Sequence, residues 1–122
     1  IEALRAGGVT QEIVAVGTNA LATSAMLKAG AQQGATGENP VLVACRDADI
    51  ITGPIGIVIA DALLGEITPS MAAAVGQSAA IRVLLPVNRC APQVAGVPVL
   101  TRVQLIEAAV DKIESLCRGE TP

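Results

Sequence analysis

Short aliphatic runs alternate along the chain with segments whose apolar residues recur every three or four positions. Runs rich in Ile, Val, Leu and Ala occupy residues 12–17, 49–52 and 80–85, and a briefer one lies at 97–100. Unbroken apolar runs of this length are typical of strands in a parallel sheet, because helices cover both faces of such a sheet. We therefore predict strands in these four segments.

Helices are predicted between these strands from their end signals. Asn19 is expected to cap a helix over residues 20–28 that Gly30 closes. Thr68 followed by Pro69 predicts a helix over 69–75, since proline fits the first helical turn.

The last helix has the clearest pattern. Thr101 and Gln104 form a capping box, which places the start of the helix after Thr101. Its apolar stripe recurs at steps of three and four residues. The stripe consists of Val103, Ile106, Val110 and Ile113. We expect residues 118–122 to fray.

Four further segments are less regular. Residues 1–6, followed by two glycines, predict the last turns of a helix, and residues 57–64 predict a buried helix. Residues 40–47 fit a helix capped by Asn39 with Pro40 at its first position, although 41–44 would also serve as a strand. The glycine-rich segment 34–39 is expected to be either a flap over a site or a solvated loop.

Alternating strands and helices predict one α/β domain with three layers, a mostly parallel sheet and right-handed crossovers. Doubly wound domains generally open on a strand, whereas the pattern here opens on the end of a helix. We therefore expect a first strand and the start of its helix to precede Ile1.

Composition adds limits to this picture. Of the 122 residues, 52% are hydrophobic and none is aromatic, so the core must consist of small aliphatic side chains. This aliphatic content favours burial against a second copy, and we expect a homo-oligomer. The most apolar stretch, residues 50–65, contains Pro54 and Asp61 and is shorter than the roughly 20 residues of a membrane span. We therefore expect no membrane partner.

Charge and reactive residues exclude several classes of function. With 8 basic and 11 acidic residues and no aromatic ring, the chain lacks both the cationic surface and the stacking platforms that bind nucleic acid. The absence of His excludes a His-ligated metal, a Ser-His triad and a Cys-His dyad. The three widely spaced cysteines form no CxxC pair, so we predict no metal site, no disulfide framework and a reducing, cytoplasmic location.

Ligands of open α/β sheets bind at the carboxyl ends of the strands. Three strand ends carry small or polar residues that suit ligand contact. The candidate ligand-binding residues are Gly17, Thr18, Asn19, Gly53, Pro54, Gly56 and Asn88. Each turn also has a purely structural interpretation, as a strand exit with a helix cap or as a tight turn. No acidic residue follows the first of these strands, which weakens a specific prediction of NAD.

Two carboxylates are candidate acid/base groups. Asp61 lies among apolar neighbours, which predicts a buried carboxylate, although a structural partner explains such burial better than catalysis does. Glu66 precedes the helix cap at Thr68 and either stabilises that helix end or reaches the site. Cys90 lies beside Arg89, but no base nearby in the sequence supports a nucleophile there.

Four blocks of the sequence carry a resemblance to a known family. They are residues 18–31, 34–39, 49–61 and 85–90. Together they resemble a family of short bacterial proteins, domain of unknown function family 3842. Its members begin with a strand and a loop of the pattern Gly-Gln-Gly-Gly-Gly-Ile-Gly that looks like a phosphate cradle, and the present sequence starts after the place of that loop. The resemblance implies a Rossmann-like fold and no particular activity.

The sequence therefore supports three hypotheses for the function. The leading hypothesis is binding of a nucleotide, a dinucleotide or a small anionic metabolite at the carboxyl edge of the sheet. The alternatives are a small enzyme that uses Asp61 or Glu66 as its acid/base, and a non-catalytic oligomeric partner protein.

Overall fold

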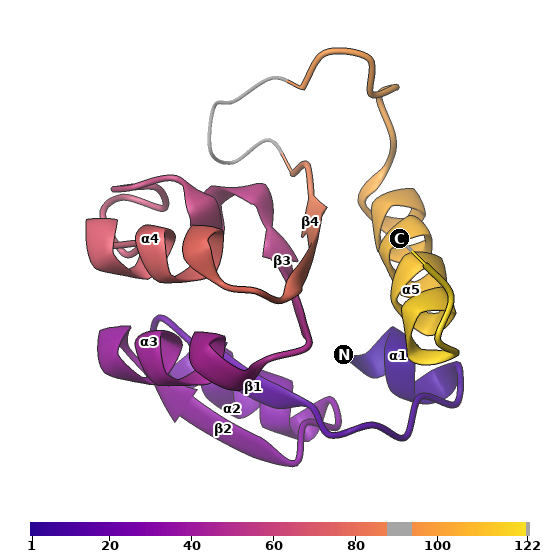
Figure 1. Cartoon of the computed structure of the whole chain (residues 1–122), viewed down its shortest axis with the longest axis horizontal. Coiled ribbons are helices and arrows are strands. Elements are labelled where there is room, and N and C mark those ends of the chain that lie inside the picture. The colour runs from indigo at the N-terminus through magenta and orange to yellow at the C-terminus, as the bar shows by residue number, and fades with distance from the viewer. Residues whose placement is uncertain (88–93, 122) are drawn as a thin grey trace.

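Strands and helices alternate along the chain in the computed structural model, which describes residues 1–87 and 94–121 (Figure 1). The elements are α1 (Glu2–Ala6), β1 (Val14–Gly17), α2 (Ala20–Lys28), β2 (Gln33–Thr36), α3 (Glu38–Asp47), β3 (Ile50–Pro54), the 3-10 helix η1 (Ile55–Val58), α4 (Pro69–Gln77), β4 (Ile81–Leu85) and α5 (Arg102–Cys117). The chain is therefore an α/β protein.

The strands form two parallel pairs. β1 pairs with β2 from Val14 opposite Gln33, and β3 pairs with β4 from Ile50 opposite Ile81. No ladder joins the two pairs among the described residues. In Figure 1, α3 and α4 lie one above the other, whereas α1 and α5 lie together at the opposite end of the view.

Helix caps place three of the helices where the sequence predicts them. The Asn19 side chain accepts a hydrogen bond from the backbone N–H of Ala22 at 2.9 Å, and Thr68 Oγ1 accepts one from Met71 at 3.1 Å. Both bonds of the capping box between Thr101 and Gln104 are present. The predicted starts of α2, α4 and α5 are therefore confirmed.

The buried core is small. One cluster of buried residues contains Ile67, Met71 and Ala72, and aliphatic side chains of α3, η1 and the turns after η1 pack around it. The apolar stripe of α5 is buried only in part, because Ile113 is 6% exposed whereas Val103 is 64% exposed.

The glycine-rich segment differs from both of its predicted forms. Residues 33–36 are β2 rather than loop, because they pair with β1 in parallel. Residues 40–47 are helical, so the helix prediction is confirmed and the strand alternative is wrong. The cap is Gly37, whose φ of 107° favours glycine, and Pro40 therefore lies further inside the first turn than Asn39 capping would have placed it.

Two other predicted elements are absent. Residues 57–64 do not form an α-helix: η1 ends at Val58, and positive φ angles at Asp61, Leu63 and Leu64 turn the backbone instead. Residues 97–100 form no strand, because no other described strand pairs with them and Pro98 lacks a backbone N–H.

The length of the helices indicates whether any of them could cross a membrane. Within residues 1–87 and 94–121, every helix falls short of the length and apolar character that a membrane crossing requires.

Candidate functional site

The turn after β1 is held by a buried threonine of α2. Thr23 is 6% exposed, and its hydroxyl lies 3.2 Å from the carbonyl of Asn19 and 2.8 Å from the hydroxyl of Thr36. A Cβ atom on Gly17 would lie 2.8 Å from the backbone nitrogen of Thr23 and still closer to its hydroxyl. Gly17 is therefore required for close packing of β1 against the first turn of α2.

The ends of β1 and β2 meet at this turn. The Gly37 N–H donates to the Gly17 carbonyl at 3.0 Å, which brings the start of α3 next to the exit of β1. Asn19 uses its side chain to cap α2, so its predicted structural role is present. Gly17, Thr18 and Asn19 thus occupy the carboxyl end of a parallel strand beside the start of a helix, where ligands of α/β sheets bind.

A hydrogen bond of long range brings a carboxylate to this turn. The Thr18 hydroxyl donates to Glu66 Oε2 at 3.0 Å, although the two residues are 48 positions apart. Both candidate residues therefore lie together in the structure. The acidic group that is missing from the sequence after β1 is supplied by the segment that precedes α4.

A second threonine–glutamate pair connects the neighbouring helix starts. The hydroxyl of Thr68, which caps α4, donates to the carboxylate of Glu38, the first residue of α3. Sequence reasoning did not select Glu38, because an acidic residue in the first turn is a common helix-stabilising feature and signals no site. The pairs Thr18–Glu66 and Thr68–Glu38 together link the starts of α2, α3 and α4, and we call these four residues the threonine–glutamate cluster.

The candidate turn after β3 is closed by its own packing. Gly56 is buried, and its carbonyl accepts a hydrogen bond from Ile59 at 3.0 Å. A Cβ on Gly53 would lie 3.1 Å from Ile57 Cδ1, and Pro54 ends the strand without a backbone donor. Gly53, Pro54 and Gly56 therefore have a clear structural role in turning the chain from β3 into η1.

Asp61 differs from its predicted environment. The residue is exposed in the turns after η1, and its backbone N–H donates to the Ile67 carbonyl at 2.7 Å. The expectation of a buried carboxylate is therefore wrong, because the apolar neighbours form turns that direct Asp61 outward instead of a buried helix. Asn88, Arg89 and Cys90 lie outside the described residues.

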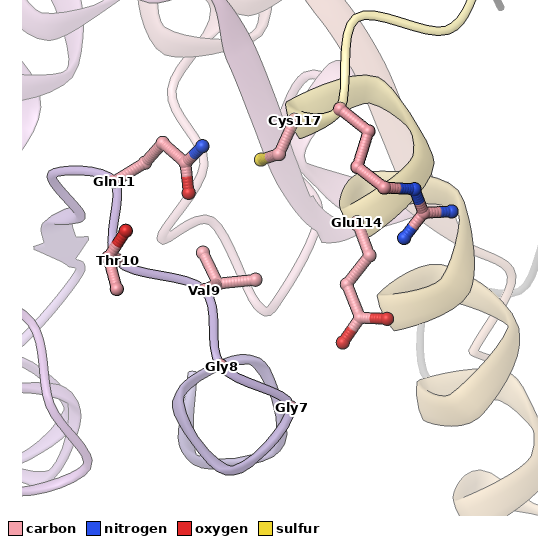
Figure 2. A pocket seen from close by; sticks show the side chains of 8 residues that line it. Gly7, Gly8, Val9, Thr10, Gln11, Glu114 and Cys117 are labelled. Carbon is pink, nitrogen blue, oxygen red and sulfur yellow. The ribbon is translucent and has the colours of Figure 1, made fainter.

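A cavity of about 240 Å³ lies away from the predicted edge, between the α1–β1 connection and the end of α5 (Figure 2). Its lining is mostly polar backbone and side chains. The lining residues are Gly7, Gly8, Val9, Thr10, Gln11, Glu114, Cys117 and Arg118. Arg118 Nε lies 3.0 Å from Glu120 Oε2, so this guanidinium already has an acidic partner. The sequence contains no signal for this cavity, because its two sides are about a hundred residues apart.

Metal binding finds no support in the part of the chain that the structure describes, where no three Cys, Asp or Glu residues group closely enough to hold an ion.

Comparison with known proteins identifies a family and no individual relative. A search of curated proteins and a search of solved structures both found no match to the chain. The family model described as Domain of unknown function (DUF3842) matches residues 1–118. The resemblance stated from the four sequence blocks is therefore confirmed, and the chain belongs to the DUF3842 family.

Proposed function

We propose that the protein binds a nucleotide or a similar small metabolite at the carboxyl edge of β1, with Thr18 and Glu66 contacting hydroxyl groups of the ligand. The observation that carries this proposal is the 3.0 Å hydrogen bond between these two side chains at the exit of a parallel strand. In dinucleotide-binding folds, an acidic side chain at the corresponding strand end accepts hydrogen bonds from ribose. Glu66 has the chemistry for that role.

The charges of the cluster indicate which part of the ligand would bind there. Glu38 and Glu66 are both exposed carboxylates, and they would repel a phosphate placed between them. A ribose has hydroxyl donors and no charge, so it suits Glu66 better. Under this proposal the anionic part of the ligand lies further along the edge, near backbone N–H groups of the turns.

The absence of aromatic residues makes a direct binding measurement simple. The protein contributes little absorbance near 260 nm, where adenine absorbs, because it has no Trp, Tyr or Phe. Equilibrium dialysis against adenosine, AMP, ATP or NAD therefore reports bound nucleotide from absorbance alone. Inorganic phosphate, followed by calorimetry, separates recognition of the nucleoside from recognition of the anion.

The variant Glu66→Gln tests the role of the carboxylate. Loss of a charge-assisted hydrogen bond, worth about 1.5–3 kcal/mol, should weaken nucleoside binding by about tenfold or more. The matched control is Glu107→Gln, which removes the same charge from an exposed position on α5. Binding to none of the four nucleotides and nucleosides, or equal binding by both variants, would contradict the proposal.

A further inference from the structure

The cavity between the α1–β1 connection and the end of α5 lies apart from the proposed nucleotide site (Figure 2). Residues 7–11 form one wall of the cavity and precede β1, whereas Thr18 follows β1. The cavity and the threonine–glutamate cluster are therefore at opposite ends of this strand. The cavity volume of about 240 Å³ is below the range of about 300–1,000 Å³ that holds drug-sized ligands, so it suits a molecule with few non-hydrogen atoms.

Glu114 of α5 places a half-buried carboxylate in this cavity. Figure 2 shows the carboxylate directed toward the end of α1 at Gly7. A Cβ atom on Gly7 would overlap Glu114 Oε1, so the absence of a side chain at Gly7 makes room for the carboxylate. Within residues 1–87 and 94–121, no Lys or Arg forms a salt bridge with Glu114.

The backbone on both sides of the cavity has its N–H groups directed into the helices. The N–H groups of residues 7–9 donate to carbonyls of α1 at 3.0–3.1 Å, and those of residues 118–120 donate to carbonyls of α5. These groups are therefore not free to hold an anion. The carboxyl end of α5, a helix of 16 residues, carries partial negative charge that favours a cation.

The charged side chains favour a cation as well. Arg118 is the basic residue of the lining, and its Nε lies 3.0 Å from Glu120 Oε2. Glu120 therefore compensates the charge of Arg118, and the charge of Glu114 remains uncompensated. A ligand that brings a positive charge and hydrogen-bond donors would complete this arrangement.

We propose that this cavity binds a small organic molecule through a primary ammonium group that donates to the carboxylate of Glu114. A primary ammonium group has three N–H donors and no acceptor, so it suits a carboxylate beside the carbonyls of a helix end. The hydroxyl of Thr10 and the amide of Gln11 line the same cavity and suit a polar remainder of the molecule. This site is independent of the proposed nucleotide binding.

Other cations fit the cavity less well. A quaternary ammonium group has no N–H donor and is usually held by aromatic faces, which this chain lacks. Ca²⁺ takes about six to eight oxygen ligands, several of them carboxylates, whereas Glu114 is the acidic residue among those that line the cavity. The chemistry therefore favours an amine over a metal ion.

Cys117 provides a reporter inside the cavity. It follows Glu114 by three positions on α5, so the two side chains lie on the same side of the helix. Both residues line the cavity, and Figure 2 shows the Cys117 sulfur directed toward Gln11. A disulfide probe whose ammonium group binds Glu114 would therefore hold its sulfur atoms close to this thiol.

Thiol–disulfide exchange with probes of different charge tests the proposal on the full chain. Cystamine has an ammonium group at each end, hydroxyethyl disulfide is neutral, and dithiodipropionate is anionic. The Cys117 thiolate attacks one sulfur of the probe, the S–S bond of the probe breaks, a mixed disulfide forms and the other half leaves as a thiolate, so no further oxidant is needed. Mass spectrometry of the tryptic peptide 113–118 measures the rate. The same chain unfolded in urea corrects for the intrinsic reactivity of each probe.

After this correction, cystamine should react with Cys117 at least about tenfold faster than hydroxyethyl disulfide, because a charge-assisted hydrogen bond to Glu114 holds it beside the thiol. Dithiodipropionate should react most slowly. Cys45 is buried and does not line the cavity, so it should show no such preference.

Two variants separate the carboxylate from general effects of charge. Glu114→Gln should remove the preference for cystamine, whereas Glu107→Gln, at an exposed position of the same helix, should retain it. Gly7→Ala keeps the charge of Glu114 but displaces its carboxylate, so it should lower the preference, and the φ of −79° at this position permits alanine. Circular dichroism verifies that each variant is folded.

Competition by free amines completes the test. Ethylammonium chloride should slow the reaction of cystamine at Cys117, whereas an equal concentration of tetramethylammonium chloride, which has no N–H donor, should have little effect. Equal slowing by the two salts would indicate general screening and would overturn the proposal. Equal corrected rates for cystamine and hydroxyethyl disulfide would also overturn it, as would a preference that persists in Glu114→Gln. Glu66→Gln should leave the preference unchanged, so this result does not depend on nucleotide binding.

Discussion

Arg5 shows how much one side chain contributes to the arrangement of this small fold. Its guanidinium donates to the carbonyls of Gly30, Val9 and Gln11 and to the side chain of Gln32. The same Gln32 oxygen accepts the Ile13 N–H at 2.6 Å. Arg5 therefore connects α1, the approach to β1 and the approach to β2, and the planar fork of arginine suits several acceptors at once.

We expect Arg5→Lys to lower the free energy of unfolding by about 1–3 kcal/mol, because an ammonium group cannot reach these acceptors together and leaves some unpaired. Urea unfolding followed by far-ultraviolet circular dichroism measures the change. Arg102→Lys, at the exposed start of α5, is the matched control and should change stability by less than about 0.5 kcal/mol. Equal effects of the two substitutions would show that the Arg5 hydrogen bonds contribute nothing specific.

The cysteines also differ at the residue scale. Burial raises the pKa of the Cys45 thiol, because desolvation disfavours the thiolate. Cys117 is half-buried. At pH 8, alkylation by iodoacetamide should therefore be slower at Cys45 than at Cys117, as read by mass spectrometry of the two peptides.

The raised pKa also determines the sign of a pH effect on stability. The unfolded thiol ionises at a lower pH than the folded one, so the unfolded state loses its proton first as pH rises. Cys45 contributes fully to the free energy of unfolding below the thiol pKa of the unfolded state. This contribution is lost as the pH rises toward the thiol pKa of the folded state. Cys45→Ala should reduce the decline of stability above about pH 8.5, where an unfolded thiol begins to ionise. An unchanged decline would show that Cys45 does not cause it.

At the scale of elements, both kinds of local signal succeeded in part. The apolar runs 12–17, 49–52 and 80–85 correspond to β1, β3 and β4. The caps at Asn19, Thr68 and Thr101 identified their helix starts because each cap is a local hydrogen bond within three residues. β2 has no apolar pattern and exists because β1 pairs with it, which no local signal encodes. The apolar run 57–64 matched a helix in composition, but periodicity does not distinguish a buried helix from packed turns.

In the candidate site, too, local patterns predicted some features, whereas others depend on the tertiary structure. Gly17, Thr18 and Asn19 were predicted from a strand end, whereas the contact between Thr18 and Glu66 depends on a fold that joins positions 48 residues apart. The burial predicted for Asp61 failed because it rested on the incorrect helix. Local patterns therefore identified Thr18 as a candidate residue, and only the tertiary structure shows that Glu66 lies beside it.

The close packing of β1 against α2 can be tested by replacing glycine with alanine at Gly17 and, for comparison, at Gly76. Gly17→Ala should destabilise the protein by about 1–3 kcal/mol, since the new methyl group would collide with backbone and side chain of Thr23. Gly76→Ala in α4 has open space around it and should stabilise by about 0.5–1 kcal/mol through helix propensity. Thermal unfolding by circular dichroism compares them, and shifts of the same sign would contradict the close packing at Gly17.

At the scale of the whole molecule, the notable property is the amount of aliphatic surface. Large apolar side chains are exposed on α2, α3 and α5 and in residues 94–99. α5 packs against α1 and β4, yet Val103 and Ile106 on this helix stay exposed. The exposed part of α5 is consistent with the homo-oligomer expected from composition.

Val103 and Ile106 make this expectation testable, because they lie one turn apart on α5 and are 64% and 37% exposed. If this surface binds a second copy, Val103→Glu with Ile106→Glu should weaken self-association by at least about tenfold, since burying each carboxylate would cost more than 1.4 kcal/mol. Sedimentation velocity over a range of protein concentrations measures the association.

Arg102→Glu, an acidic substitution at a polar position beside Val103, controls for added charge. Circular dichroism should show the same helix content in every variant, because the substituted side chains face solvent in the monomer. A wild-type protein that sediments as a monomer at high concentration would exclude this role of α5, as would a double variant that associates as strongly as Arg102→Glu.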